Sequence, residues 1–356
     1  MRDEARLGFC CKFIPEEPPG THATLKAAKA AALAMNLTSA TMAHLTKLAP
    51  AARREKIAGI VLHNLAALER QIAWVGARPP LERLLRIASS VLPGYTHPIA
   101  APIYAEPELA RIVEDGLARA GAGARERGVR LSFHPGPFCL LASRNPAAIA
   151  NGIDELEYHA RIFEMMGYGG GWHPHGAHIN IHLGARDPGL AGFRETLPRV
   201  SRVGRDLITI ENDDFGFDLD ELLPLADIVP LVLDLHHHWV RSEGQYIEPD
   251  DPRIAVIRTS WRGVRPIAHV SVSREGLWPD QDPDALPDFP ALRAAGISGR
   301  DLAAHSDLMW NRAVNDFVAR HLAWADFEIE AKAKNIASVG IADHVRAAGR
   351  PAIAAE

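Results

Sequence analysis

The stretch that decides the fold is IVPLVLDLHHHW, residues 228–239. It begins as a nearly continuous apolar run and then changes abruptly to an aspartate and three histidines. A short apolar run without alternation is typical of a strand that is buried on both faces of a parallel sheet. Polar residues at the end of such a strand lie where α/β barrels build their active sites. The same pattern recurs along the chain.

Eight short β-like runs divide the chain, and helical segments separate most of them. The runs cover residues 6–13, 85–89, 129–133, 178–183, 207–211, 229–235, 267–271 and 327–330. The segments that read as helices cover residues 23–35, 51–75, 108–120, 154–166, 219–225 and 306–323. This alternation over 356 residues predicts an α/β fold, a TIM-type (β/α)8 barrel. We expect a single domain, residues 1–356, with a loop insertion at 277–290.

Composition excludes some classes of function. Lys and Arg number 39 against 44 Asp and Glu, so the net charge of −5 gives no overall basic signature of a nucleic-acid binder. Bound divalent ions can reverse the local sign of the charge. No apolar run approaches the roughly 20 residues of a membrane span, and no signal peptide opens the chain. We therefore expect a cytoplasmic protein with no membrane contact and no obligate protein partner.

Side chains that ligate metals recur at the carboxyl ends of six consecutive β-like runs. They are His134 in SFHPG, His182 in NIHLG, Glu211 in IENDD, Asp234 and His237 in the opening stretch, His269 in IAHVS, His305 in the AHSD that follows, and Glu330 in FEIEAK. A lone strand histidine is more often a core residue, and a carboxylate at a strand end can cap the next helix. Six strands in succession weaken that account, because neighbouring buried carboxylates repel unless a cation neutralises them.

The ligand types indicate a catalytic metal centre. Histidine with carboxylate suits Zn2+ or Mn2+, and the absence of cysteine from these positions argues against a structural zinc site. Eight candidate ligands exceed the needs of one ion, so we expect two or three. Such clusters are suited to phosphoryl transfer. Glu211 and Asp234 are the expected bridging carboxylates, because they end adjacent strands.

Other histidines carry less weight. Strand alternation is expected to turn His236 and His238 away from His237. Three further histidines lie in or just after a Gly-rich segment, where we expect contact with solvent or substrate. They are His173, His175 and His178.

An ordered set of short motifs resembles the UV damage endonuclease family over nearly the whole chain. The motifs are RLGF at 6–9, RIASSVLPGYTH at 86–97, HPG at 134–136, IHLG at 181–184, IENDD at 210–214, DLHHH at 234–238, HSD at 305–307 and EAKAK at 330–334. Each motif is unspecific alone, but the ordered set is specific.

The resemblance implies a TIM barrel related to endonuclease IV that holds a cluster of Mn2+ or similar ions, with Zn2+ or Mg2+ as alternatives. It implies cleavage of damaged double-stranded DNA 5′ to ultraviolet photoproducts and other lesions. The eight ligands would be those named above, with Glu211, Asp234 and Glu330 as the catalytic carboxylates. His97 would lie near the lesion, while Phe9 and Phe138 would stack on unstacked bases.

Basic side chains near the predicted strand ends are candidates for phosphate contacts. They include Lys12, Arg86, Arg186 and Arg274, and each can equally be a solvated surface charge.

The chain departs from the family pattern at three positions. Pro137 replaces a glutamine that the family inserts at the lesion, and proline offers no side-chain donor. Ile267 replaces a lysine that the family modifies to carry a carboxylate into the metal cluster. Phe9 replaces a tyrosine and loses its hydroxyl.

These departures keep other classes of function open. The alternative is a metal-dependent small-molecule enzyme, similar to the sugar isomerases on related barrels, with its pocket narrowed by the loop at 277–290. A barrel that binds metal without catalysis is a third possibility.

Overall fold

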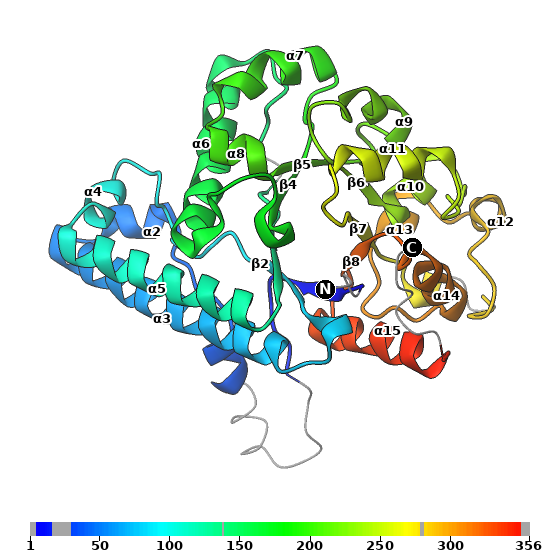
Figure 1. The fold of residues 1–356 in the computed structure, drawn as a ribbon, viewed down its shortest axis with the longest axis horizontal. Helices are drawn as coiled ribbons and strands as arrows, with labels where there is room; N and C mark the ends of the chain where they lie inside the picture. The colour runs from blue at the N-terminus through cyan, green and yellow to red at the C-terminus, as the bar shows by residue number, and fades with distance from the viewer. Residues whose placement is uncertain (1–4, 16–29, 137–138, 278–280, 350–356) are drawn as a thin grey trace.

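Eight parallel strands close into a barrel in the computed structural model, which describes residues 5–15, 30–136, 139–277 and 281–349 (Figure 1). The strands are β1 (Leu7–Cys10), β2 (Leu84–Ile87), β3 (Arg130–Phe133), β4 (His178–His182), β5 (Ile208–Glu211), β6 (Leu231–Asp234), β7 (Ile267–Val270) and β8 (Asp326–Ile329). Each strand pairs with the next in sequence, and β8 closes the ring on β1. The predicted (β/α)8 barrel is confirmed.

The connections between strands are largely helical. The helices are α2 (Met42–Lys47), α3 (Pro50–Gly76), α4 (Ala101–Tyr104), α5 (Pro107–Glu126), α6 (Pro146–Phe163), α7 (Gly189–Thr196), α8 (Arg202–Leu207), α9 (Leu219–Leu222), α10 (Leu235–Arg241), α11 (Pro252–Ser260), α12 (Phe289–Ala294), α13 (Gly299–Ala303), α14 (Arg312–His321) and α15 (Asn335–Ala347). In the described residues, no helix is both long enough and apolar enough to cross a bilayer.

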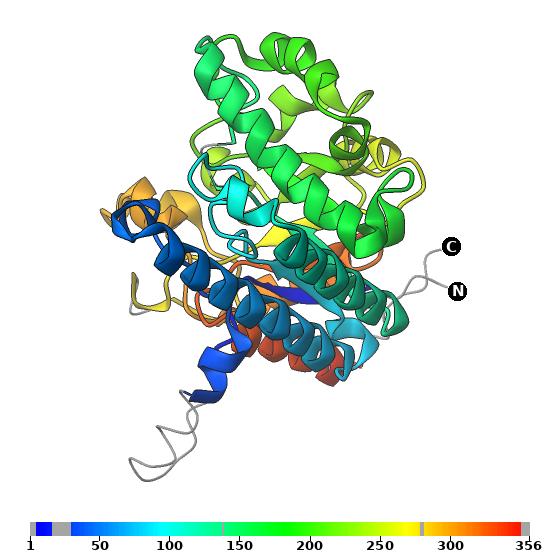
Figure 2. The ribbon, with the colours of Figure 1, turned by 90° about the vertical axis from the view of Figure 1, so that its left-hand side faces the viewer.

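The two longest helices lie side by side on one flank of the barrel (Figure 2). Both begin with a proline, which suits the first helical turn because its missing N–H has no partner there. Gly116 of α5 allows close approach, since a Cβ there would lie 2.6 Å from the Leu65 side chain of α3. The predicted helices at 51–75 and 108–120 are thus confirmed, although α5 continues to Glu126, well beyond the predicted end.

One predicted helix begins later than expected. The sequence indicates a helix over 306–323, whereas α14 begins only at Arg312. The preceding residues bond elsewhere, as when the Ser306 N–H donates to the Val272 carbonyl. The Asn311 side chain then caps α14 by accepting a hydrogen bond from the Val314 N–H at 2.8 Å.

The barrel interior is polar, and the helices cover an apolar outer face. On β3, Phe133 points outward to Phe163 of α6, with ring centroids 4.9 Å apart. Its neighbour Ser132 instead donates a hydrogen bond to Glu328 of β8. Because β3 and β8 do not pair with one another, this contact crosses the barrel interior.

A buried ionic cluster forms the floor of the barrel. Asp326 at the start of β8 pairs with Arg130 at 2.8 Å, Arg265 at 2.7 Å and Arg6 at 3.4 Å. Burial alone raises the pKa of this carboxyl, but the three guanidinium groups outweigh it and lower the pKa below its usual value. The aspartate is therefore ionised and joins strands from both halves of the chain.

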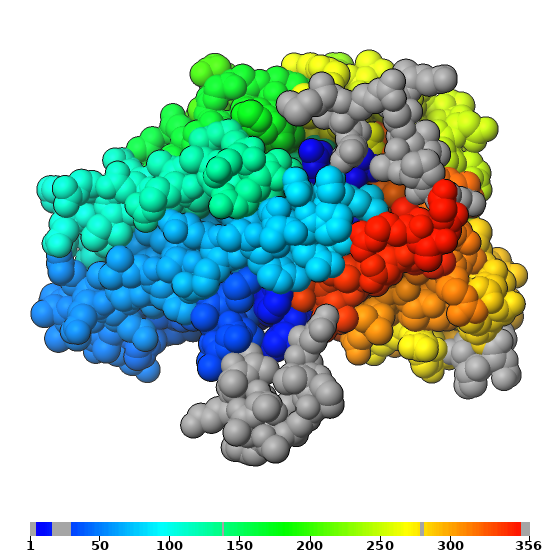
Figure 3. Space-filling view, turned by 60° about the horizontal axis from the view of Figure 1, so that its bottom comes forward, coloured from blue at the N-terminus to red at the C-terminus, as the bar shows by residue number. Residues whose placement is uncertain are grey.

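The end of the chain packs against its first half. Figure 3 shows α15, in red, against the cyan segment near residue 80. An ion pair of 2.7 Å joins Arg346 of α15 to the buried Glu82, which precedes β2.

The excursion after β7 packs on α10. Phe289 of α12 lies edge-on to Trp239 of α10, with centroids 5.1 Å apart. Val240, Leu292 and Leu302 complete this small apolar cluster. The insertion predicted at 277–290 falls partly outside the described residues, since 278–280 are not among them.

Candidate metal centre

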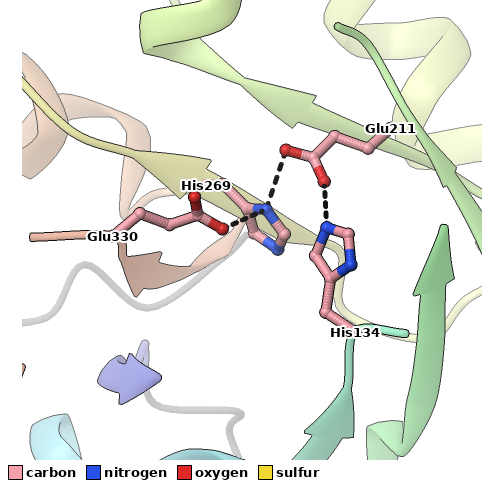
Figure 4. A group of neighbouring side chains, drawn as sticks. All are labelled: His134, Glu211, His269 and Glu330. Atoms are coloured by element: carbon pink, nitrogen blue, oxygen red, sulfur yellow. Dashed lines mark hydrogen bonds and ion pairs between the residues drawn. The ribbon is translucent and has the colours of Figure 1, made fainter. Parts of the chain in front are cut away.

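Glu211, the last residue of β5, lies at the centre of the predicted site (Figure 4). Its Oε2 atom lies 3.1 Å from His134 Nε2, and its Oε1 atom lies 3.0 Å from His269 Nδ1. Asn180 of β4 also donates a hydrogen bond to Oε2. Glu330, just after β8, approaches the same histidine, with Oε1 at 3.3 Å from His269 Nδ1. Four side chains from four strand ends thus converge.

Two overlapping groups have ligand atoms close enough for a metal ion. One contains His134, Glu211, His269 and Glu330, and the other contains Glu211, Asp234 and His237. Within each group, one ligand atom per residue lies within 4.8 Å of the others. Glu211 belongs to both groups, and that is the geometry of a carboxylate shared by two neighbouring ions.

Strand register explains why these residues meet. His182 pairs with Glu211 across β4 and β5, and Asp234 pairs with His269 across β6 and β7. The carboxyl ends of these strands are therefore level, and side chains at matching positions face the same end of the barrel.

His237 reaches the centre from a helix, which corrects the strand-alternation argument. Strand β6 ends at Asp234, and the three consecutive histidines lie in α10. Asp234 caps this helix, because its Oδ1 atom accepts a hydrogen bond from the His237 N–H at 2.7 Å. Helical rotation, about 100° per residue, separates His236 and His238 from the ligand face.

Two of the eight predicted ligands lie at the edge of the cluster. His182 Nε2 is 4.0 Å from Glu211 Oε2, and the side chain is 27% exposed. His305 Nδ1 is 3.8 Å from Glu330 Oε2 and 2.8 Å from the Glu330 carbonyl oxygen. Both lie near the cluster, but neither belongs to the two close groups.

The charges of the cluster fit a divalent cation. Burial disfavours the ionised Glu211, but His269, His182 and other histidines outweigh it and hold the pKa of Glu211 well below its usual value. Burial also opposes protonation of His269, yet Glu211 and other neighbours raise its pKa to about 10. In the described chain, the buried Asp234 Oδ2 has no hydrogen-bond partner. A nitrogen- and oxygen-donor set with a buried unpartnered carboxylate oxygen suits Mn2+, Zn2+ or Mg2+.

Two residues of the centre were missed by the sequence interpretation. Glu328 is fully buried, and Arg86 pairs with both Glu328 and Glu330 inside the barrel. Arg86 was a candidate for a phosphate contact or, equally, for a solvated surface charge, and its burial contradicts both interpretations. The alternating acids of DFEIE, residues 326–330, were the available signal, because alternate residues of a strand face the same side.

The predicted substrate contacts are placed differently from one another. Phe9 is only 2% exposed and packs edge-on against Trp74 of α3 at 5.9 Å, so the structure contradicts its stacking role. Strand alternation is the reason, since Phe9 faces the helices rather than the interior. Lys12 is exposed beyond the carboxyl end of β1, and His97 is partly exposed in the loop after β2. Phe138 and Pro137 lie outside the described residues.

The burial of other predicted positions decides their roles. Ile267 is buried in β7 and offers no ligand atom. Contact with solvent was expected for three histidines. His173 and His178 are buried, which contradicts the expectation, whereas His175 is exposed.

An exposed aromatic residue near the centre was also missed. Phe215, in the loop after β5, is 68% exposed. Asp213 Oδ1 accepts hydrogen bonds from the N–H groups of Phe215 and Gly216, at 2.7 and 2.6 Å. The other oxygen of Asp213 lies 3.4 Å from His182 Nδ1. The turn that presents Phe215 is therefore tied to the edge of the metal centre.

Fold and site together define a class: a TIM-barrel protein with His, Asp and Glu side chains that could hold metal ions at the carboxyl ends of its strands. The family model described as UV-endonuclease UvdE matches residues 20–348. The chain belongs to this UV-endonuclease family.

Individual relatives have low sequence identity to this chain, but the alignments are long. A UV DNA damage endonuclease of Bacillus velezensis is 26% identical over 318 residues, which cover 86% of this chain and 88% of the relative. A UV-damage endonuclease of Neurospora crassa is 28% identical over 214 residues, 56% of this chain but only 32% of the relative. The chain thus aligns with about a third of the fungal protein's length. The solved structure of SacUVDE matches with a TM-score of 0.71 at 19% identity, covering 97% of this chain and 99% of that chain, and shares the fold.

Proposed function

We propose that the protein is a DNA repair endonuclease that hydrolyses the phosphodiester 5′ to ultraviolet photoproducts or other lesions in double-stranded DNA. The observation that carries the proposal is the sharing of Glu211 by two groups of metal ligands. Family membership supports the substrate class, and the Bacillus velezensis relative is itself named for UV DNA damage.

We assign two ions, Mn2+ by preference, to the two groups. His134, His269 and Glu330 would hold one ion with Glu211, while Asp234 and His237 would hold the other. His182 and His305, at the edge, would be available to a third. Bound ions would supply a nucleophile at neutral pH and stabilise the leaving oxygen.

The chain's own residues would bind and orient the DNA around this centre. Lys12, exposed beyond β1, would pair with a backbone phosphate. His97 would contact the duplex near the lesion. Phe215 adds an exposed ring beside the centre, on which an unstacked base would lie.

The small-molecule alternative has no comparable contact to support it. That alternative relied on the loop at 277–290. In the described part of this loop, Asp284 pairs with Arg312 at 2.5 Å, and the Pro287 carbonyl accepts a hydrogen bond from Tyr246. Among residues 281–290, no hydrogen bond or ion pair reaches a predicted ligand.

Incision of a labelled duplex that carries one ultraviolet photoproduct, with Mn2+ present, tests the proposal. Glu211→Gln is expected to abolish the cut, while Glu82→Gln, a buried ion-paired glutamate before β2, is expected to preserve it. If the protein binds two or more ions but cuts neither this duplex nor an abasic one, the endonuclease proposal fails and a small-molecule substrate is favoured.

A further inference from the structure

Strand β8 and the residue after it place three carboxylates at three levels of the barrel interior. Asp326 belongs to the ionic floor, and Glu330 belongs to the upper ligand group. Glu328 lies between them, is 1% exposed, and belongs to neither. A buried carboxylate is costly unless its surroundings compensate it, so its contacts indicate its role.

The two nitrogens of His269 face different carboxylates. His269 Nδ1 lies 3.0 Å from Glu211 Oε1 and 3.3 Å from Glu330 Oε1. His269 Nε2 lies 3.3 Å from Glu328 Oε2. One edge of the ring therefore faces the ligand group, and the other faces Glu328.

Glu328 is itself held from both sides. Ser132 donates a hydrogen bond to its Oε1 atom, and Arg86 Nε donates to its Oε2 atom. The second nitrogen of the guanidinium, Arg86 Nη2, donates to Glu330 Oε1 at 2.6 Å. The same Nη2 atom is 3.1 Å from His269 Nε2 and 3.3 Å from His269 Nδ1, so its contact is divided between the two ring nitrogens.

A neutral imidazole carries one N–H donor and one lone pair. Carboxylates lie beside both ring nitrogens, but an ion held by Glu211 and Glu330 would take the Nδ1 lone pair. The proton would then lie on Nε2, where Glu328 can accept its hydrogen bond. Carboxylates in this arrangement behind a metal-binding histidine fix the ring and strengthen it as a ligand.

We propose that Glu328 is a positioning residue of the metal centre: it accepts a hydrogen bond from His269 Nε2 and so presents Nδ1 to the ion, while Arg86 balances its charge. This inference rests on the metal centre of the proposed function. It assigns a role to a residue that touches neither the ion nor the DNA.

Calorimetric titration of the full chain with Mn2+ tests the proposal. Glu328→Gln is expected to weaken binding of one ion by about 10- to 100-fold, the usual effect of losing such an outer partner. Asp326→Asn is the matched control, because it removes a buried, arginine-paired carboxylate from the same strand and the same face. The control is expected to lose stability but to keep wild-type ion affinity. Wild-type affinity in Glu328→Gln would overturn the proposal.

A double variant separates positioning from simple charge balance. Arg86→Met with Glu328→Leu removes both charges and leaves the net charge of the interior unchanged. If Glu328 served only as a counter-ion, this double variant would bind Mn2+ as tightly as the wild type, and the proposal would be wrong. We expect the weakening to persist, because leucine at position 328 offers His269 Nε2 no carboxylate to hold the ring.

A crystal structure of the wild-type protein with Mn2+ gives a readout that needs no variant. Nδ1 of His269 is expected on the ion, with Nε2 toward Glu328. A ring with Nε2 on the ion would overturn the proposal even if the variants fail to fold. Failure of the wild type to bind Mn2+ would overturn the proposed metal centre as well. That outcome differs from one in which the wild type and Glu328→Gln bind Mn2+ equally well, which would overturn only the role of Glu328.

Discussion

Replacing Glu211 with glutamine tests whether one carboxylate serves two ions. The substitution removes the negative charge that faces His134, His269 and His237, at 3.1, 3.0 and 3.4 Å. The glutamine keeps the size of the side chain, so a change in ion binding reports the charge. Because Glu211 belongs to both ligand groups, both ions should be lost together.

The expected size follows from linkage. An ion present at 100 times its dissociation constant stabilises the folded chain by about 2.7 kcal/mol. An unfolding entropy of about 2.1 cal/mol/K per residue gives about 750 cal/mol/K for 356 residues, so each ion should raise the melting temperature by about 3.6 °C. A 100-fold loss of affinity lowers this contribution to about 0.4 kcal/mol, or roughly 0.5 °C per ion.

Thermal unfolding with and without Mn2+ measures this effect as a difference within each variant. The wild type should gain about 7 °C from two ions, and Glu211→Gln about 1 °C. Asp234→Asn should keep about half of the wild-type gain, and Glu82→Gln should keep all of it. If Glu211→Gln kept half of the gain, Glu211 would serve one ion only and the shared-carboxylate reasoning would be refuted.

Three further predictions concern the floor and the DNA contacts. Asp326→Asn leaves three arginines unpaired and should cost about 3–5 kcal/mol at pH 7 in urea unfolding. The arginines lower the folded-state pKa of Asp326, so its contribution to the free energy of unfolding is present above the unfolded pKa of about 3.9 and is lost as the pH falls through the folded pKa. The difference in unfolding free energy between variant and wild type should therefore close in acid, and a difference that stays constant with pH would contradict this reasoning. Phe215→Ala should weaken binding to a lesion-bearing duplex by about 1–3 kcal/mol in a fluorescence titration, with the Mn2+ shift unchanged, and undiminished affinity would exclude stacking. Lys12→Ala should weaken binding to damaged and intact duplexes alike and reduce the slope of log affinity against log salt by about 1, whereas an unchanged slope would remove the phosphate contact.

The fold was predictable because its signals are local. Several strands lie in short apolar runs, and each of the two longest helices begins at a proline, so both types of element are visible within short windows. The upper ligand groups were predictable for a related reason. A residue at the end of a parallel strand has its height in the barrel fixed by that strand, so Glu211 and Asp234 need no further information to meet.

The missed features depend on contacts between distant segments. Arg86 and Glu328 are 242 positions apart and meet only because closure of the barrel places β2 and β8 on either side of β1. Phe9 was misplaced because a family motif identifies a residue without giving its orientation on the strand. The histidines after Asp234 were assigned to a strand because an N-cap and a strand end can share the same aspartate.

The position of β8 at the end of the barrel sequence has a consequence for biosynthesis. On the ribosome, the first seven strands emerge with Arg86, Arg130 and Arg265 but without Asp326, Glu328 and Glu330, the carboxylates with which these arginines pair. A seven-stranded nascent chain is therefore both open at its edge and unbalanced in internal charge. The arrival of one strand closes the hydrogen-bonded ring, brings the carboxylates that pair with these arginines and supplies Glu330 to the candidate metal centre in a single step. A chain that stops before residue 326 would lack all three at once.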